Sequence, residues 1–136
     1  MKINEIFGIK YPIIQGGMAN IATGEFAAAV TNAGGLGLIG AGGMKAEMLR
    51  EQIRICKSLV DKEHEGKFGV NIMLMNPNSE EVAKIVIAED KVDTFIEMGP
   101  GRTISGFVKK IDREKKTITI DKYEDFVKAM EELKNA

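Results

Sequence analysis

The sequence has little from which a metal centre or a disulfide could be built: its 136 residues include one cysteine, Cys56, and one histidine, His64. A single cysteine forms no internal disulfide, so a reducing cytoplasm is the expected location. One Cys and one His cannot build a closed zinc site, and we expect no metal site. Cys56 lies on the apolar face of a predicted helix and His64 in a charged, solvated loop, so we expect neither to be catalytic.

The sequence also has no excess of charge and no long apolar run. A net charge of −1 gives no general attraction to nucleic acid or to an anionic membrane. The apolar runs are far shorter than the roughly 20 residues that span a bilayer, and residues 1–5 do not resemble a signal peptide. A composition of 44% apolar and 29% charged residues is typical of one globular domain.

Short β-branched runs alternate with longer amphipathic runs along the whole chain. Strands are predicted over residues 11–15, 36–39, 68–74, 94–98 and 117–120. Helices are predicted after the N-caps Thr23 and Ser79, over about residues 45–60 and over residues 104–111, and after a capping box of Asp121 and Glu124. This alternation favours an α/β fold with parallel strands. Because a closed eightfold barrel needs roughly 200–250 residues, we expect an open sheet or a partial barrel.

Two helices have apolar faces that we expect to be buried. The helix over residues 45–60 is expected to bury Leu49, Ile53, Cys56 and Leu59. The last helix is expected to bury Phe126, Val127, Met130 and Leu133.

Glycine is concentrated in one part of the chain, since nine of the 15 glycines lie between Gly16 and Gly43. A predicted strand runs directly into Gly16 and Gly17, which are followed by the unbranched Met18. Without a Cβ, such a loop lets backbone groups approach a flat ligand. A tight turn between strand and helix is the alternative interpretation.

Gly35, Gly37 and Gly40 match the spacing G-x-G-x-x-G, but not its required context. A dinucleotide fingerprint follows a strand and opens a helix, whereas this segment follows a helix and is itself a predicted strand. A second frame that starts at Gly40 has Lys45 in its sixth position. The sequence therefore does not favour a Rossmann-type nucleotide site.

Asn71 is the one polar side chain that we expect inside the apolar strand over residues 68–74. An unsatisfied buried amide costs about 1–3 kcal/mol, so it needs partners. Its donor and acceptor lie side by side, which suits the edge of a flavin or a nucleobase. A hydrogen bond to a neighbouring loop is the alternative.

Three motifs, YPIIQGGMA, TNAGGLGLIG and FGVNIML, resemble in order and spacing the first three βα units of one enzyme family. These are the FMN-dependent enoyl-acyl-carrier-protein reductases and nitronate monooxygenases. The resemblance covers about residues 1–90 and implies a TIM barrel with FMN at the C-terminal strand ends. It implies that Gly17, Met18 and Ala19 run along the flavin and that Asn71 contacts FMN. It also implies NAD(P)H as electron donor and a substrate that is a small molecule or is linked to acyl-carrier protein. Asn20 replaces an aromatic residue found in many reductases, so enoyl thioester and nitronate both stay open.

The rest of the chain, about residues 91–136, resembles the C-terminal end of malonyl-CoA:acyl-carrier-protein transacylase. The shared features are a strand, the turn Gly99-Pro100-Gly101 and the pair Ser105-Gly106. None of the serines Ser58, Ser79 and Ser105 lies in the G-x-S-x-G elbow that this chemistry needs. Taken alone, the Gly-Pro-Gly run predicts a turn between a strand and a helix.

These features predict two segments, 1–90 and 91–136, that form about three barrel-like βα units continued by a βαβα tail, short of a complete barrel. The resemblance implies a truncated or fused relative of an FMN-dependent oxidoreductase, linked to fatty-acid synthesis and inactive alone. The parts that would hold the FMN phosphate and catalyse the reaction have no match here, and we assign no catalytic residue. The alternatives are a non-catalytic α/β fragment or pseudogene product that self-associates through open sheet edges, or a protein named for its transacylase-like tail.

Overall fold

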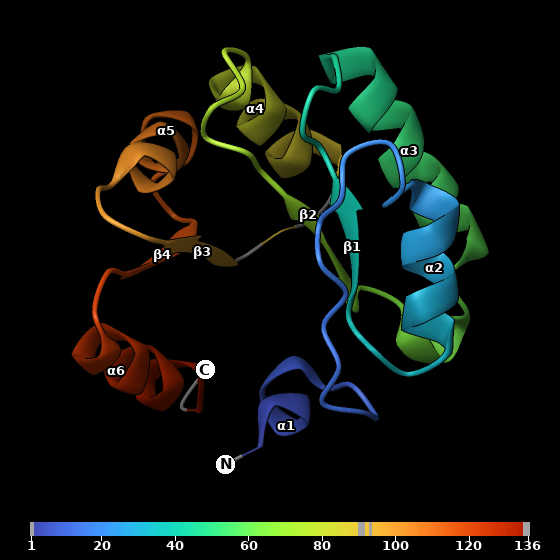
Figure 1. Ribbon diagram of the computed structural model, residues 1–136, viewed down its shortest axis with the longest axis horizontal. Helices are drawn as coiled ribbons and strands as arrows, with labels where there is room; N and C mark the ends of the chain where they lie inside the picture. Colours follow the sequence, from blue (N-terminus) through green and yellow to red (C-terminus); the bar gives the residue numbers. More distant parts are fainter. Residues whose placement is uncertain (1, 90–91, 93, 135–136) are drawn as a thin grey trace.

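The computed structural model describes residues 2–89, 92 and 94–134, in which helices and parallel strands alternate (Figure 1). The elements in chain order are α1 Ile3–Phe7, α2 Gly24–Asn32, β1 Gly37–Gly40, α3 Ala46–Leu59, the 3-10 turn η1 Lys62–His64, β2 Phe68–Asn71, α4 Ser79–Glu89, β3 Thr94–Met98, α5 Thr103–Ile111, β4 Lys116–Ile120 and α6 Tyr123–Lys134. The predicted boundary between residues 90 and 91 lies outside the described residues.

The strands form two parallel pairs, which confirms the predicted α/β class. In the first pair, β1 and β2 run in register from Gly37 opposite Phe68 to Gly40 opposite Asn71. In the second pair, β3 and β4 run from Thr94 opposite Lys116 to Met98 opposite Ile120. Figure 1 shows α2, α3, α4 and α5 outside the arc of strands, whereas α6 lies on the other side of β3 and β4 from α5.

The prediction of a buried strand over residues 11–15 is wrong. This segment makes a single parallel bridge, between Ile14 and Leu36, beside β1. Tyr11, Ile13 and Ile14 remain 44%, 60% and 41% exposed. Pro12 has no N–H to donate to a ladder, and the backbone N–H of Ile13 instead donates to the Tyr11 carbonyl in a local turn.

The strand predicted over residues 68–74 ends early, at Asn71. Its partner β1 ends at Gly40, opposite Asn71, so the pairing stops there. The chain then turns, with the backbone N–H of Asn76 donating to the Met73 carbonyl at 3.0 Å. The C-terminal ends of β1 and β2 consequently lie side by side at one edge of the sheet.

The helix ends follow the capping rules with two corrections. The Thr23 hydroxyl accepts the backbone N–H of Phe26 at 3.2 Å, as predicted. At α6, the carboxylate that accepts the N–H of Lys122, at 3.1 Å, belongs to Asp125 and not to Glu124. The reason is that the helix begins at Tyr123, two residues after the predicted cap Asp121. Ser79 is likewise the first residue of α4 rather than its cap.

The buried faces of two helices differ from the prediction at their edges. In α3, Leu49, Ile53 and Cys56 are fully buried, but Leu59 is 48% exposed. In α6, Ala129 is buried, Met130 and Leu133 are partly buried, and Phe126 and Val127 are about 40% exposed. A helix that meets a two-stranded sheet buries a narrow stripe, so residues at the rim of the apolar face remain in contact with solvent.

One hydrophobic core extends from α2 to α5. It joins Ile39, Leu49, Ile53 and Cys56 to the apolar side of α4 and to residues of β3 and α5, which include Phe95, Ile104 and Val108. Through the part of the chain that the structure covers, no helix is both long enough and apolar enough to cross a bilayer. The core fixes the strands from the helix side and leaves their C-terminal ends open.

Candidate functional site

The glycine-rich loop over residues 16–19 lies across the C-terminal end of β1. An ideal Cβ built on Gly40 would be 2.7 Å from the Met18 carbonyl oxygen and 3.0 Å from the Met18 nitrogen. The N–H of Gly40 donates to the carbonyl of Ala22 at 2.9 Å, and the N–H of Ala22 donates to that of Met18 at the same distance. Gly40 must therefore be glycine for the loop to rest on the strand end.

Gly17 lies directly against the side chain of Asn71, the last residue of β2. An ideal Cβ on Gly17 would be 2.5 Å from Asn71 Cγ and 2.6 Å from Asn71 Oδ1. The backbone oxygen of Asn71 in turn accepts the N–H of Ala41 at 3.1 Å. The structure thus brings together two of the predicted site residues that are 54 positions apart in the sequence.

The prediction that Asn71 is a buried, inward amide is wrong, because its side chain is exposed. Within the described part of the chain, this amide has no hydrogen-bond partner. The residue stands where β2 ends, so its side chain lies against Gly17 and is not enclosed by the core. An exposed side-chain amide keeps both a donor and an acceptor available.

Exposed apolar side chains lie on the glycine loop and on the segment that follows β2. Met18 and Met73 are 41% and 45% exposed, and Leu74 and Met75 follow at 43% and 84%. Met73 Sδ lies 3.3 Å from the position that a Cβ on Gly42 would take, and Ala19 Cβ lies 3.9 Å from it. The third predicted loop residue, Ala19, is therefore part of the same surface. An exposed amide rimmed by polarizable apolar side chains suits a flat, partly polar ring.

Gln15, which the sequence analysis did not single out, fastens the start of the loop to β1. Its Nε2 donates to the Leu38 carbonyl at 2.9 Å and to the Gly16 carbonyl at 3.2 Å. Its Oε1 accepts the N–H of Leu38 at 3.3 Å. The sequence feature that could have identified Gln15 is its position as the polar residue that ends the otherwise apolar run YPIIQ.

Glu97 of β3 is buried, and its carboxylate occupies the N-terminus of α5. The carboxylate accepts the backbone N–H of Ile104 at 3.1 Å and, from Ser105, the N–H at 3.0 Å and the hydroxyl at 2.8 Å. Burial raises the pKa of Glu97, but the hydrogen bonds from Ser105 and Ile104 outweigh it and hold the pKa below its usual value. The N-terminus of α5 is therefore already occupied by the negatively charged Glu97 carboxylate. Gly99 and Gly101, with φ of 118° and 114°, form the predicted turn between β3 and α5.

His64 is less solvated than predicted. Its side chain is 16% exposed, and its Nδ1 is buried without a hydrogen-bond partner among the described residues. Ligand atoms of Asp61, Glu63 and His64 lie within 4.8 Å of one another, but both acids are exposed. The 3-10 turn η1 rotates His64 toward the protein while its charged neighbours stay in water. Cys56 is fully buried in the core, as predicted.

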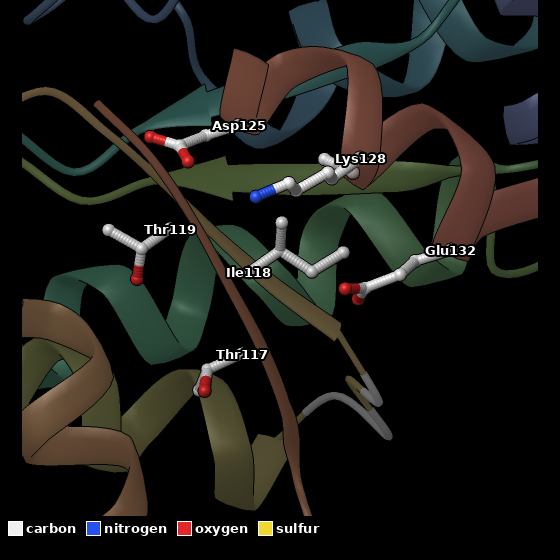
Figure 2. Close-up of a pocket in the computed structure, with 7 residues that line it drawn as sticks. Thr117, Ile118, Thr119, Asp125, Lys128 and Glu132 are labelled. Carbon is white, nitrogen blue, oxygen red and sulfur yellow. The ribbon is translucent and has the colours of Figure 1, made fainter. Parts of the chain in front are cut away.

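A hollow lies between β4 and α6 (Figure 2), two elements that are drawn apart from β1 and β2 in Figure 1. Its volume is about 210 Å³. Ile118 lies opposite Asp125, Lys128 and Glu132, which share one face of α6 (Figure 2). Charges of both signs line it, so its surface selects for no particular class of ligand.

The alternating helices and parallel strands, with the glycine loop at the strand ends, have the architecture of part of a TIM barrel. FabK from Thermotoga maritima has the same architecture with a TM-score of 0.71 and 31% sequence identity, over 96% of this chain and 40% of that chain. Its M276A mutant gives a TM-score of 0.69 at 33% identity.

Sequence relatives identify the family. The nitronate monooxygenase family model matches residues 1–128. A nitronate monooxygenase of Paraburkholderia phytofirmans is 42% identical over 78 residues, which are 57% of this chain and 20% of that relative. A probable nitronate monooxygenase of Staphylococcus aureus is 37% identical over 78 residues, which are 57% of this chain and 21% of that relative. The chain belongs to the nitronate monooxygenase family, and these matches span about a fifth of its curated relatives.

The family match continues through most of the segment that we compared with a transacylase. It runs to residue 128 and so includes β3, α5 and β4. These comparisons give the transacylase resemblance of residues 91–136 no support, and it stays a prediction from the motif around Gly99.

Proposed function

We propose that this chain forms the flavin-ring-binding part of an FMN-dependent oxidoreductase. The observation that carries the proposal is the contact of Gly17 with the free amide of Asn71 at the joined ends of β1 and β2. Family membership supports it, since residues 1–128 match nitronate monooxygenase. Of the residues that the resemblance assigns to the flavin, Gly17 and Asn71 are in contact, and Met18 and Ala19 follow Gly17 in the same loop.

The chemistry of this surface fits the ring of FMN. The absence of a Cβ at Gly17 lets the loop lie directly against the Asn71 side chain, which holds the bare loop backbone and the amide together at one strand end. Asn71 offers a donor and an acceptor side by side, which match the alternating groups of a pyrimidine edge. Met18 and Met73 provide polarizable apolar contacts for the remaining ring surface.

The residues of this chain would bind and orient the ring rather than transfer protons. Asn71 would fix its polar edge through hydrogen bonds, and the Met18 and Met73 side chains would shield it from water. When bound, FMN would supply the redox chemistry, with NAD(P)H as donor and an enoyl thioester as acceptor or with a nitronate as the substrate oxidised by oxygen. We assign the phosphate of FMN no place at α5, because the Glu97 carboxylate already accepts the donors there.

A flavin titration tests the proposal. The purified chain should quench FMN fluorescence to a defined end point and shift the visible flavin bands. Asn71→Leu, which keeps the volume and removes the amide, should weaken FMN binding about fivefold, since one net hydrogen bond contributes about 1 kcal/mol. Asn32→Leu is the matched control: its amide binds the Leu59 carbonyl and the Asp61 N–H, each at 2.9 Å, away from the loop. Unquenched FMN, or equal weakening in both variants, would refute the proposal.

A further inference from the structure

The Gln15 side chain continues the hydrogen bonding to the neighbouring strand after the Gln15 backbone has turned away from it. The Gln15 N–H donates to the Leu36 carbonyl at 3.0 Å, as a parallel neighbour would. Two residues further along β1, both backbone groups of Leu38 are bound by the Gln15 side-chain amide. The side-chain amide thus replaces the next pair of backbone hydrogen bonds, while the main chain turns away at Gly16. Only 9% of Gln15 is exposed.

We propose that Gln15 is a positioning residue that sets the place of the glycine loop for flavin binding. The same Nε2 that binds Leu38 also donates to the carbonyl of Gly16 and so fixes the peptide that leads into Gly17. Gly17 is one residue further on, and its contact with Asn71 depends on where that peptide lies. Gln15 therefore acts on the ring through Gly17, without touching it. This inference rests on the flavin site proposed above.

Glutamine has the required chemistry because it donates and accepts at the end of one planar group. Leu38 presents an N–H and a C=O to the same side, and a carboxylate or a thioether could not satisfy both. Replacement by Met keeps the length but leaves the two backbone groups of Leu38 and the Gly16 carbonyl without this partner. The loop would then move relative to β1 although the strand itself persists.

Riboflavin is the probe of choice, since it has the ring without the phosphate. Gln15→Met should weaken riboflavin binding about tenfold or more, measured by fluorescence quenching at a temperature where every variant is folded. Asn32→Leu is again the control, because the Asn32 side-chain amide also makes one hydrogen bond to a backbone N–H and one to a backbone C=O, away from the loop. Equal loss of affinity in both variants would overturn the inference.

Gln15→Glu gives a second and independent readout. A charged carboxylate cannot donate to Leu38 or Gly16, whereas a protonated carboxyl has one donor and one acceptor, which restores the pair with Leu38 but not the second donation to Gly16. Riboflavin affinity of this variant should recover in part as the pH falls from about 8 to about 5, because carbonyl neighbours and burial raise a carboxyl pKa above its usual value. The wild-type affinity should stay level. A variant that follows the wild-type profile would contradict the role of Gln15.

Amide hydrogen exchange separates this inference from the proposed function. If the wild-type chain binds no riboflavin, the flavin proposal fails. The positioning role of Gln15 is then tested by the rate of amide hydrogen exchange in the glycine loop. Gln15→Met should speed exchange at residues 16–19 and at Leu38, whereas Asn32→Leu should not. Unchanged exchange in Gln15→Met would overturn the positioning role whether or not flavin binds.

Discussion

Gly17→Ala is the substitution for which the structure makes its most specific prediction. The added methyl would lie 2.4 Å from Asn71 Cβ, 2.5 Å from Asn71 Cγ and 2.6 Å from Asn71 Oδ1. This is roughly 1 Å closer than an ordinary carbon–carbon contact. Because Asn71 Cβ is bonded to the backbone of β2, rotation of the side chain does not relieve the contact, and the loop must shift relative to the strand end by about that distance. The free energy of unfolding should therefore fall by about 1–3 kcal/mol, as in an overpacked core.

Flavin binding should weaken as well, at a temperature where the variant is still folded. A hydrogen bond needs its heavy atoms about 2.7–3.2 Å apart, and a shift of about 1 Å takes the Asn71 amide out of that range. The loss of one such bond, about 0.5–1.5 kcal/mol, corresponds to a roughly two- to tenfold weaker affinity for FMN. Fluorescence quenching would measure the affinity, and urea unfolding would measure the stability.

Gly16→Ala is the control for this prediction. The neighbouring Gly16 has nothing within 4 Å of an ideal Cβ, and its φ is not positive. This variant should bind FMN like the wild type. If the two alanine variants lose affinity equally, or if only Gly16→Ala loses it, the assigned contact between Gly17 and Asn71 does not control the site.

Three further predictions concern stability and assembly. Glu97 has a pKa held below its usual value in the folded state, so its stabilising effect should be present above the unfolded-state pKa and be lost as the pH falls through the folded pKa. Glu97→Ala should remove that acid-dependent part of the urea unfolding profile and cost about 3 kcal/mol or more near neutral pH, because several hydrogen bonds to a charge disappear. The pKa of Glu89 is lowered chiefly by its hydrogen bonds from Arg54, at 3.0 Å each, so Arg54→Leu should raise the Glu89 pKa measured by NMR, and an unchanged value would contradict the pairing. Ile13 and Met98, which are 60% and 72% exposed, should promote concentration-dependent self-association in sedimentation experiments, and Met98→Lys should reduce it.

Much of the fold could be predicted because local chemistry and tertiary packing agree. The strand over residues 94–98 alternates correctly, since Phe95 and Glu97 face α5 while Ile96 and Met98 face outward. Thr23 precedes an apolar run and caps it as expected. In these places each residue type has one low-energy role, so pattern and structure coincide.

Other features could not be predicted because they depend on what a segment meets in space. Residues 11–15 have the composition of a buried strand but find a neighbour at one position only. Asn71 looks buried from its apolar neighbours, yet it is exposed because β2 stops at that residue. Gln15 forms its hydrogen bonds with a residue 23 positions away, and no local pattern indicates that partner.

The candidate site lies between these two cases. Gly17, Met18, Ala19 and Asn71 could be identified from motifs, because glycine at a strand end and an amide in an apolar run are unusual at the level of sequence. That Gly17 lies directly against Asn71 required the structure, since the contact joins two separate strand ends. The role of Gln15 in holding them together also required it.

The account depends most on the position of the flavin ring, and NMR of the ¹⁵N-labelled chain during an FMN titration tests this most directly. We predict that the backbone amides of Gly17 and Ala19 and the side-chain amide of Asn71 shift first and saturate together. Shifts confined to the hollow that includes Thr117 and Lys128, or no shift at any FMN concentration, would contradict the account.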